Sequence, residues 1–210
     1  MASRSLFLAL LAAACGPASA FTVAISSGSP RTVYLQVGVG SFNGQYDSGG
    51  TPLNNATVNK VSVTVPANVL GNGTAQAMTT DSTAANSFYD GYTYCNVPAQ
   101  LYIGGFYRNT NNGGGSVSVT ATVPLSLVNA AGDKLPFSSI SWTTGGNGPL
   151  GDSTGQPFTA GTFTAGGVQT VGTIAVNHWA ESCWTFSFAN NTVSPAGTYT
   201  GRVLYTLTAP

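Results

Sequence analysis

The sequence predicts an all-β domain, a sandwich or barrel of about nine short strands. Apolar and polar residues alternate strictly in several runs, which is the pattern of strands with one buried face. Clusters of Gly, Asn and Pro separate these runs at regular intervals. Helix-forming residues are scarce, whereas β-branched and aromatic residues are plentiful. Because 42% of the residues are hydrophobic, we expect a folded core rather than disorder.

The first 20 residues (1–20) are typical of a secretory signal peptide. Arg4 precedes a short apolar run, and an Ala-Ser-Ala cleavage site at positions 18–20 leads to Phe21. The apolar run is shorter than the roughly 20 residues that a membrane helix needs. We therefore expect cleavage before Phe21 and no membrane span in the mature chain. Lipidation at Cys15 is the alternative.

Nine segments of the mature chain are predicted strands. The alternation is clearest in the second of them, where Val33, Leu35, Val37 and Val39 share the face that we expect to be buried. The nine segments are 21–25, 32–39, 58–65, 100–107, 116–123, 137–143, 168–176, 183–188 and 198–207. Neither a linker nor a shift in composition divides them, so residues 21–210 are expected to form a single β-sandwich domain.

A short motif, Phe-Thr-Ala-Gly, occurs twice, at residues 158–161 and 163–166. Two copies are too few for a solenoid, which needs several stacked repeats to bury its core. We therefore interpret the duplication as a feature of a hairpin or loop.

The composition argues against nucleic acid as a partner and favours association with other copies. Among the 190 residues after residue 20, only 11 are charged, and the net charge is about −1. Such a chain has no basic surface to neutralise phosphates, so we expect no binding to nucleic acid. A surface rich in Gly, Ser, Thr and Asn with few charges avoids long-range repulsion between copies, which favours close assembly.

Removal of the signal peptide leaves two cysteines, Cys95 and Cys183. In an exported chain an even pair is expected to form a disulfide, and no cluster of His or Asp surrounds either one as a metal site would require. The bridge would close a loop of nearly 90 residues. In the chain-entropy model a loop of that length stabilises the fold by roughly 4 kcal/mol.

Residue types that carry catalysis are scarce. Hydrolysis needs an activated nucleophile or paired carboxylates, and metal sites need several His, Cys or Asp ligands. The one histidine, His178, and the one glutamate, Glu181, are expected to satisfy a loop beside the disulfide, with Trp179 and Trp184 packed on it. The alternative is an acid/base pair or half of a metal site. We expect no enzymatic activity, no cofactor and no metal.

Tyrosines offer one candidate surface for a ligand. Tyr89, Tyr92 and Tyr94 surround an Asp-Gly turn, and aromatic faces beside short polar side chains suit a carbohydrate. Tyrosines of β-proteins also lie at the edge of the core with a hydrated hydroxyl, and this alternative stays open. The candidate ligand-facing residues are Tyr89, Tyr92, Tyr94, Tyr102, Tyr107 and Trp142.

The C-terminus carries the most specific pattern. Pro-Ala-Gly-Thr-Tyr at 195–199 leads into an alternating run with Tyr199, Val203, Tyr205 and Leu207 on its apolar face. This ending resembles the pilin-like subunits of bacterial fimbriae, in particular those related to spore coat protein U. Gly197, the fourteenth residue from the end, matches the glycine of the family's C-terminal assembly motif. The chain has Ala209 at the penultimate position, where the family usually carries an aromatic residue.

The resemblance implies an immunoglobulin-like antiparallel β-sandwich that lacks one strand, which the N-terminal extension of another subunit supplies. An open edge of unpaired backbone groups above exposed core would accept an alternating strand. Residues 21–30 are the candidate donor segment, since Phe21, Val23 and Ile25 alternate with small or polar residues and a Gly/Ser/Pro hinge follows. The alternative is an ordinary first strand, paired within its own chain.

The expected function follows from these features together. We expect an exported structural or adhesive subunit of a bacterial surface appendage, which passes through the periplasm and assembles by donor-strand complementation. Its candidate partners are other copies of itself or related subunits, an export chaperone and a surface glycan. The alternative is a secreted, monomeric β-sandwich that binds carbohydrate through the tyrosine-rich face.

Overall fold

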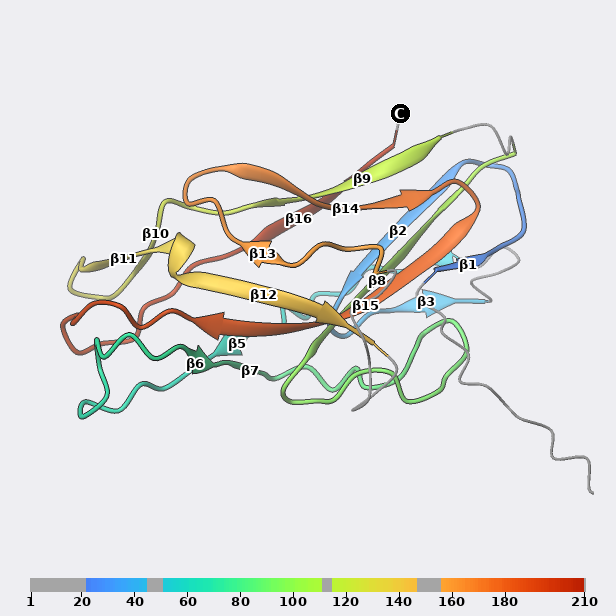
Figure 1. Cartoon of the computed structure of the whole chain (residues 1–210). Coiled ribbons are helices and arrows are strands. Elements are labelled where there is room, and N and C mark those ends of the chain that lie inside the picture. The colour runs from blue at the N-terminus through green and yellow to red at the C-terminus, as the bar shows by residue number, and fades with distance from the viewer. Residues whose placement is uncertain (1–21, 45–50, 111–114, 147–155, 210) are drawn as a thin grey trace, which may run out of the picture.

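Antiparallel strands in two layers make up the fold. The computed structural model describes residues 22–44, 51–110, 115–146 and 156–209. These residues form sixteen strands and one short 3₁₀ helix, η1 (Phe137–Ser139), with no α-helix among them. Figure 1 shows a three-stranded sheet above a larger sheet. The predicted all-β sandwich is confirmed.

The larger sheet has the strand order β13-β12-β15-β8-β2, and β1 and β6 also pair with β15. Its strands are β1 (Thr22–Ala24), β2 (Thr32–Val37), β6 (Gln76–Ala77), β8 (Leu101–Arg108), β12 (Ile140–Gly145), β13 (Gly161–Thr162) and β15 (His178–Phe188). The long strand β15 is central, because β12 and β1 share one of its edges while β8 and β6 share the other.

The three-stranded sheet has the order β14-β9-β16. Its strands are β14 (Val168–Ala175), β9 (Ser116–Thr122) and β16 (Leu204–Thr208). Short pairs complete the fold at its ends: β3 (Phe42–Asn43) with β4 (Thr51–Pro52), β5 (Val61–Ser62) with β7 (Thr79–Thr80), and β10 (Ser126–Val128) with β11 (Lys134–Pro136).

The strand order corresponds to that of an immunoglobulin sandwich, in which A, B, E and D form one sheet and C, F and G the other. Across the larger sheet, β2, β8, β15 and β12 occupy positions A, B, E and D. In the other sheet, β9 and β16 occupy positions C and F, with β14 on the far side of β9. Among the described strands, none occupies position G beside β16.

The larger sheet is buried on both faces, and β15 contributes to each. Alternate side chains of a strand point to opposite faces. On one face, Ala180, Trp184 and Phe186 join the main core, defined here as the buried apolar cluster between the two sheets. On the other face, Trp179 and Cys183 belong to a second core. The buried members of the second core are Ile25, Tyr34, Ala84, Tyr94, Cys95, Tyr102, Phe106, Trp179 and Cys183.

A covering loop, defined here as residues 82–98, closes the second core. It contributes Ala84, Tyr94 and Cys95, and Cys95 is bonded to Cys183 of β15. The predicted disulfide is confirmed. This bond attaches the loop to the central strand, and side chains on the face of the larger sheet that points away from the main core are buried beneath the loop.

The Phe-Thr-Ala-Gly duplication lies in loops and short bridges, as predicted. Phe158 and Phe163 are both buried in the main core. Phe163 packs against Trp142 with ring centroids 4.6 Å apart, and Phe158 packs against Trp184 at 5.9 Å. The repeat therefore places two aromatic rings in the main core, against Trp142 and Trp184 of the larger sheet.

Several predicted segments differ from the structure. The strand predicted at 137–143 starts only at Ile140 and runs to Gly145, because residues 137–139 form η1. The segment 58–65 forms a strand only at Val61–Ser62, because its one ladder partner is the two-residue strand β7. The last strand starts at Leu204 rather than residue 198, after an isolated bridge between Thr200 and Val128. The residues around His178 and Glu181 do not form a loop; they lie within β15, paired with β8.

Candidate functional site

Two free strand edges lie beside one another. In the order of their sheets, β2 and β16 are each the last strand, with β8 and β9 as their partners on the other side. The two strands contact each other across the side of the sandwich. Among the described strands, none pairs with the outer edge of either one. These edges therefore present backbone groups that another strand could pair with.

The apolar side chains below these edges are incompletely covered. Leu35 and Val37 of β2 pack against the main core but remain half-buried, and Val33 is 38% exposed. Tyr205 and Leu207 of β16 are likewise half-buried against the same core. The main core is therefore only partly covered along the line between β2 and β16.

The face of β2 that the sequence predicts to be buried is the less buried one. Tyr34 and Gln36 point to the opposite face and are only 7% and 3% exposed. The Tyr34 hydroxyl donates to Oε1 of Gln36, at 2.7 Å, and the Gln36 amide donates to the Gly38 carbonyl. The second core thus covers one face of β2 more completely than the main core covers the other.

The C-terminal residues singled out in the sequence lie along the free edge and the turn before it. Tyr205 is the second residue of β16, where its ring packs edge-on against Trp184, with centroids 5.8 Å apart. Burial raises the pKa of Tyr205 well above its ordinary value. Val203 also packs against the main core, just before the strand begins. Tyr199 lies outside the strand, and its hydroxyl donates to the Pro195 carbonyl at 2.9 Å.

Gly197 lies in a bend that comes close to another loop. A Cβ atom at this position would be 2.9 Å from Nδ2 of Asn129. The glycine therefore allows the chain to pass Asn129 on its way to β16.

The candidate donor segment pairs with its own chain in this structure. Thr22, Val23 and Ala24 form β1, in register with Ala180, Trp179 and His178 of β15. The Ile25 amide continues the pairing with a hydrogen bond to the Asn177 carbonyl, at 2.8 Å, and the Ile25 side chain is buried in the second core. Phe21, the first candidate donor residue, lies outside the described residues.

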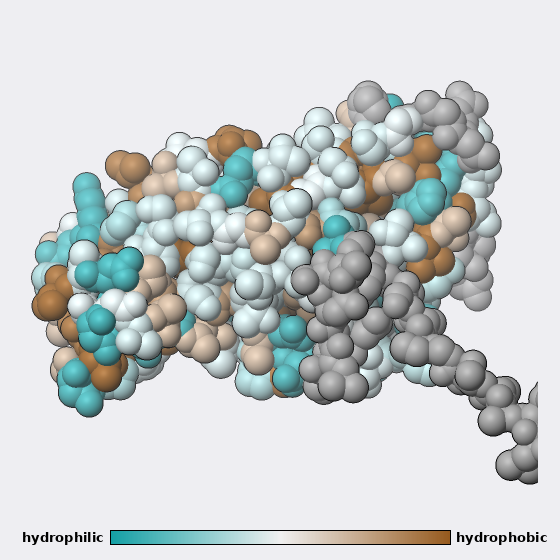
Figure 2. All heavy atoms as spheres, viewed as in Figure 1, coloured by the Kyte–Doolittle hydropathy of each residue, from teal (hydrophilic) through white to brown (hydrophobic). Residues whose placement is uncertain are grey.

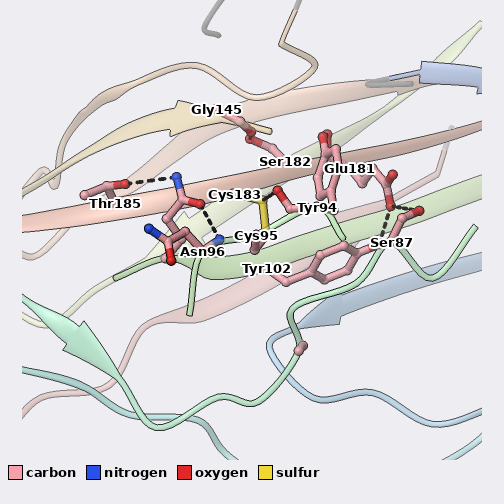
Figure 3. The surroundings of a disulfide bond; sticks show 12 residues. Ser87, Tyr94, Cys95, Asn96, Tyr102, Gly145, Glu181, Ser182, Cys183 and Thr185 are labelled. Carbon is pink, nitrogen blue, oxygen red and sulfur yellow. Dashed lines mark hydrogen bonds between the residues drawn. A yellow bond between two sulfur atoms is a disulfide. The ribbon is translucent and has the colours of Figure 1, made fainter. Parts of the chain in front are cut away.

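Next to the disulfide, a buried network surrounds Glu181 (Figure 3). Oε2 of Glu181 accepts hydrogen bonds from three donors: the Tyr102 hydroxyl at 2.7 Å, the Ser87 hydroxyl at 3.0 Å and the Trp179 indole at 3.0 Å. The Tyr94 hydroxyl donates to the Glu181 carbonyl at 2.9 Å. The network joins the covering loop to β8 and β15, and no local sequence pattern indicates it, because its members are up to 94 residues apart.

Burial and hydrogen bonding act on Glu181 in opposite directions. The side chain is 1% exposed, and this burial raises the pKa of the carboxyl above its ordinary value of 4.5. The hydrogen bonds from Tyr102, Trp179 and Ser87 act to lower the pKa. Oε1 is buried as well, and it has no hydrogen-bond partner in the described part of the chain. Burial, followed by the charge of Glu181, raises the pKa of Tyr102 well above its ordinary value.

His178 and Glu181 do not form an acid/base pair. They are three residues apart on one strand, so their side chains point to opposite faces of the sheet. Nδ1 of the partly exposed His178 is 2.8 Å from the Val176 carbonyl. Within the described ranges, no group of three or more His, Cys, Asp or Glu is placed to hold a metal ion.

The six candidate ligand-facing residues do not share a surface. Tyr94, Tyr102, Tyr107 and Trp142 are at most 3% exposed, in two different cores. Trp142 stacks on Trp184 with centroids 5.1 Å apart. Tyr92 is exposed at the tip of the covering loop and Tyr89 is half-buried. The expected aromatic surface is therefore wrong for four of its six members, because their side chains are buried in the main core or the second core.

No protein-family model, curated protein or solved structure matches this chain. Among the residues that the structure describes, no helix has the length and apolar character to cross a membrane.

Proposed function

We propose that the chain is an exported, non-enzymatic subunit of a surface assembly in which each copy is completed by a strand from another copy. The observation that carries the proposal is the pair of adjacent free edges, β2 and β16, above a half-buried part of the main core. A strand placed there would pair with free backbone groups and cover apolar side chains at the same time.

The strand order supports this proposal. An immunoglobulin sandwich carries strand G beside strand F, and β16 has position F in this chain. The added strand would therefore take position G. Its apolar side chains would cover Tyr205 and Leu207 from one side and Leu35 and Val37 from the other.

The N-terminal segment has the chemistry of such a strand. Val23 and Ile25 alternate with Thr22, Ala24 and Ser26, so a paired strand would direct its large apolar residues to the core and its small or polar residues to water. The buried disulfide fits an oxidising, extracytoplasmic environment. Residues of intermediate hydropathy cover most of the visible surface, between smaller strongly polar and apolar patches (Figure 2), which suits close packing of copies.

The proposal is tested by electron microscopy of the cell-surface fraction after expression through the native export route. Filaments formed by the wild-type chain should disappear in the double variant Val23→Ser with Ile25→Ser, which removes the apolar face of the donor. The control is the double variant Thr22→Ser with Ala24→Ser, which changes the polar face of the same segment and should leave filaments intact.

A mature protein that stays monomeric in every condition, including co-expression with its export partners, would contradict the proposal. In that outcome the carbohydrate-binding alternative would take precedence, with the exposed Tyr92 as the first residue to change.

A further inference from the structure

The residues proposed as the donor are already paired in this chain, at a place other than the open edge. β1 lies on β15, whereas the open site lies between β2 and β16. Val23 is directly opposite Trp179, and Ile25 is buried in the second core. The segment therefore directs its apolar face at the second core of its own chain. If it completed a neighbouring subunit, the same face would have to cover the main core of that neighbour.

The two placements exclude each other. A strand has one set of apolar side chains and one backbone, and Val23 and Ile25 cannot be packed in two subunits at once. We propose that the pairing of β1 with β15 is an autoinhibitory contact, which holds the donor in its own subunit and must open before that subunit can complete a neighbour. This inference rests on the proposed function, since it concerns the donor of the same assembly.

The contact is weak enough to open. β1 has three ladder residues, of which Thr22 and Ala24 are exposed and Val23 is half-buried. The hydrogen bond from the Ile25 amide to the Asn177 carbonyl extends the pairing by one residue. Only Ile25 is fully buried in this segment. Short, exposed strands open locally far more often than core strands do.

The chain between β1 and β2 can act as the tether. Seven residues, 25–31, separate the two strands, and most of residues 26–31 are exposed. Gly28 donates its amide to the Asn109 carbonyl at 3.2 Å. Because β2 stays paired with β8, release of residues 22–25 would free the donor without dismantling the larger sheet.

The register allows the contact to be locked by a disulfide. Ala24 is directly opposite His178, and the next pair, Ile25 with Asn177, is joined by a hydrogen bond. Pairs alternate along an antiparallel ladder, so Ala24 and His178 form a non-hydrogen-bonded pair, with Cα atoms about 4.5 Å apart. A disulfide accommodates Cα separations from about 4.4 Å. The double variant Ala24→Cys with His178→Cys should therefore cross-link.

The test compares this locked variant with the wild type and with the two single-cysteine variants, by light scattering and electron microscopy. Formation of the new bond is checked by mass spectrometry. We expect the oxidised double variant to assemble at least about tenfold more slowly than either single variant, because the disulfide removes the fraction of subunits whose donor segment is released. Mild reduction should restore assembly, since Ala24 is exposed while Cys95 and Cys183 are 2% and 0% exposed.

A second measurement shows that the locked subunit is folded and open at its acceptor edge. A synthetic peptide of residues 21–28 should bind it, and a small fraction of locked subunit mixed with wild type should shorten the filaments, because it can accept a donor but cannot give one.

The outcomes separate the two proposals. Equal assembly of the oxidised double variant and the single variants would overturn the autoinhibitory contact and leave strand exchange standing. If the wild type does not assemble and the peptide does not bind, the proposed function itself fails.

Discussion

At the scale of single residues, Glu181 has the most unusual environment. One of its oxygens accepts three hydrogen bonds, from Tyr102, Ser87 and Trp179, and the whole side chain is buried beside the disulfide. A carboxylate oxygen with three donors ties three separate segments together, and removal of it would leave all three donors buried without a partner.

Replacement of Glu181 by Ala should therefore reduce the free energy of unfolding by at least about 3 kcal/mol. Glu181→Gln keeps one oxygen for the donors and should reduce it less. Urea denaturation of both variants measures the difference. Equal losses for Ala and Gln would show that volume, rather than the acceptor oxygen, is what the site requires.

The raised pKa of Glu181 predicts a pH dependence of stability. The folded state keeps its proton to a higher pH than the unfolded chain, whose ordinary value is 4.5. The contribution of Glu181 is therefore fully present below pH 4.5, and the free energy of unfolding should fall as pH rises through the raised pKa. Denaturation across this range should show the decrease in the wild type and not in Glu181→Gln.

The pKa of Asp81 is shifted in the opposite direction to that of Glu181, so Asp81 serves as a control. The Lys60 amide donates to its carboxylate at 2.7 Å and the Asn59 amide at 3.1 Å, which lowers its pKa below 3.8. Its contribution is present above pH 3.8 and is lost as pH falls through the lowered pKa. Asp81→Asn should therefore change the acid side of the profile and leave the decrease above pH 4.5 unaltered.

At the scale of the elements, the approach of β2 to β8 depends on a glycine. A Cβ atom at Gly105 of β8 would lie against the Tyr34 carbonyl oxygen of β2, which is backbone and cannot turn aside. Gly145, in β12 of the same sheet, differs in that its nearest neighbour would be the Gln100 side chain at 3.9 Å.

Gly105→Ala should consequently destabilise the fold by about 1–3 kcal/mol, as overpacking does. Gly145→Ala should be neutral or slightly stabilising, because it reduces the freedom of the unfolded chain without a clash. Thermal denaturation of the two variants provides the comparison. A loss of the same size in both would mean that any side chain on a strand of this sheet is unfavourable.

Three of the longer strands, β8, β9 and β14, could be predicted from the sequence because their signal is local, whereas the longest strand, β15, was predicted only at 183–188. Alternation predicted β9 almost to the residue, and the apolar run at 100–107 predicted β8, which is buried on both faces. The predicted segment 168–176 became β14, although a bulge between Thr170 and Gly172 interrupts its alternation. The two- and three-residue strands carry no such signal, because their pairing depends on where distant segments end. Segment 58–65 alternates well and still forms only a two-residue strand, since its ladder partner has just two residues.

The candidate site could be predicted only in part, for the same reason. The apolar face of the C-terminal strand was recognisable from Tyr205 and Leu207, but its position beside β2 depends on the order of strands in two sheets. The tyrosines proposed as ligand-facing show that burial is also hard to predict from the sequence. The sequence pattern around a strand tyrosine does not show whether its hydroxyl is hydrated or bonded to a buried carboxylate. The Tyr102 hydroxyl is of the second kind, since it donates to Glu181.

At the scale of the whole molecule, the open line between β2 and β16 should control association. A lysine on a sheet edge hinders pairing with another strand. Val33 is 38% exposed on β2, so Val33→Lys should reduce assembly strongly while changing the free energy of unfolding by less than about 1 kcal/mol. Analytical ultracentrifugation and denaturation measure the two effects.

The matched control is Val168→Lys. Val168 is 66% exposed on β14, in the sheet position farthest from β16, and the same change there should leave assembly intact. If both lysines reduce assembly equally, charge in general rather than the β2 edge is responsible.

The dual role of β15 also determines how the molecule unfolds. Its side chains alternate between the main core and the second core, and its Cys183 holds the covering loop. Because both cores contain side chains of β15, neither core can unfold while β15 stays ordered in the other. The main core and the second core should therefore unfold as one cooperative unit. Calorimetry should accordingly give a single transition whose van't Hoff and calorimetric enthalpies agree. The covering loop, although it contains little regular structure, would then have hydrogen-exchange protection close to that of the central strand.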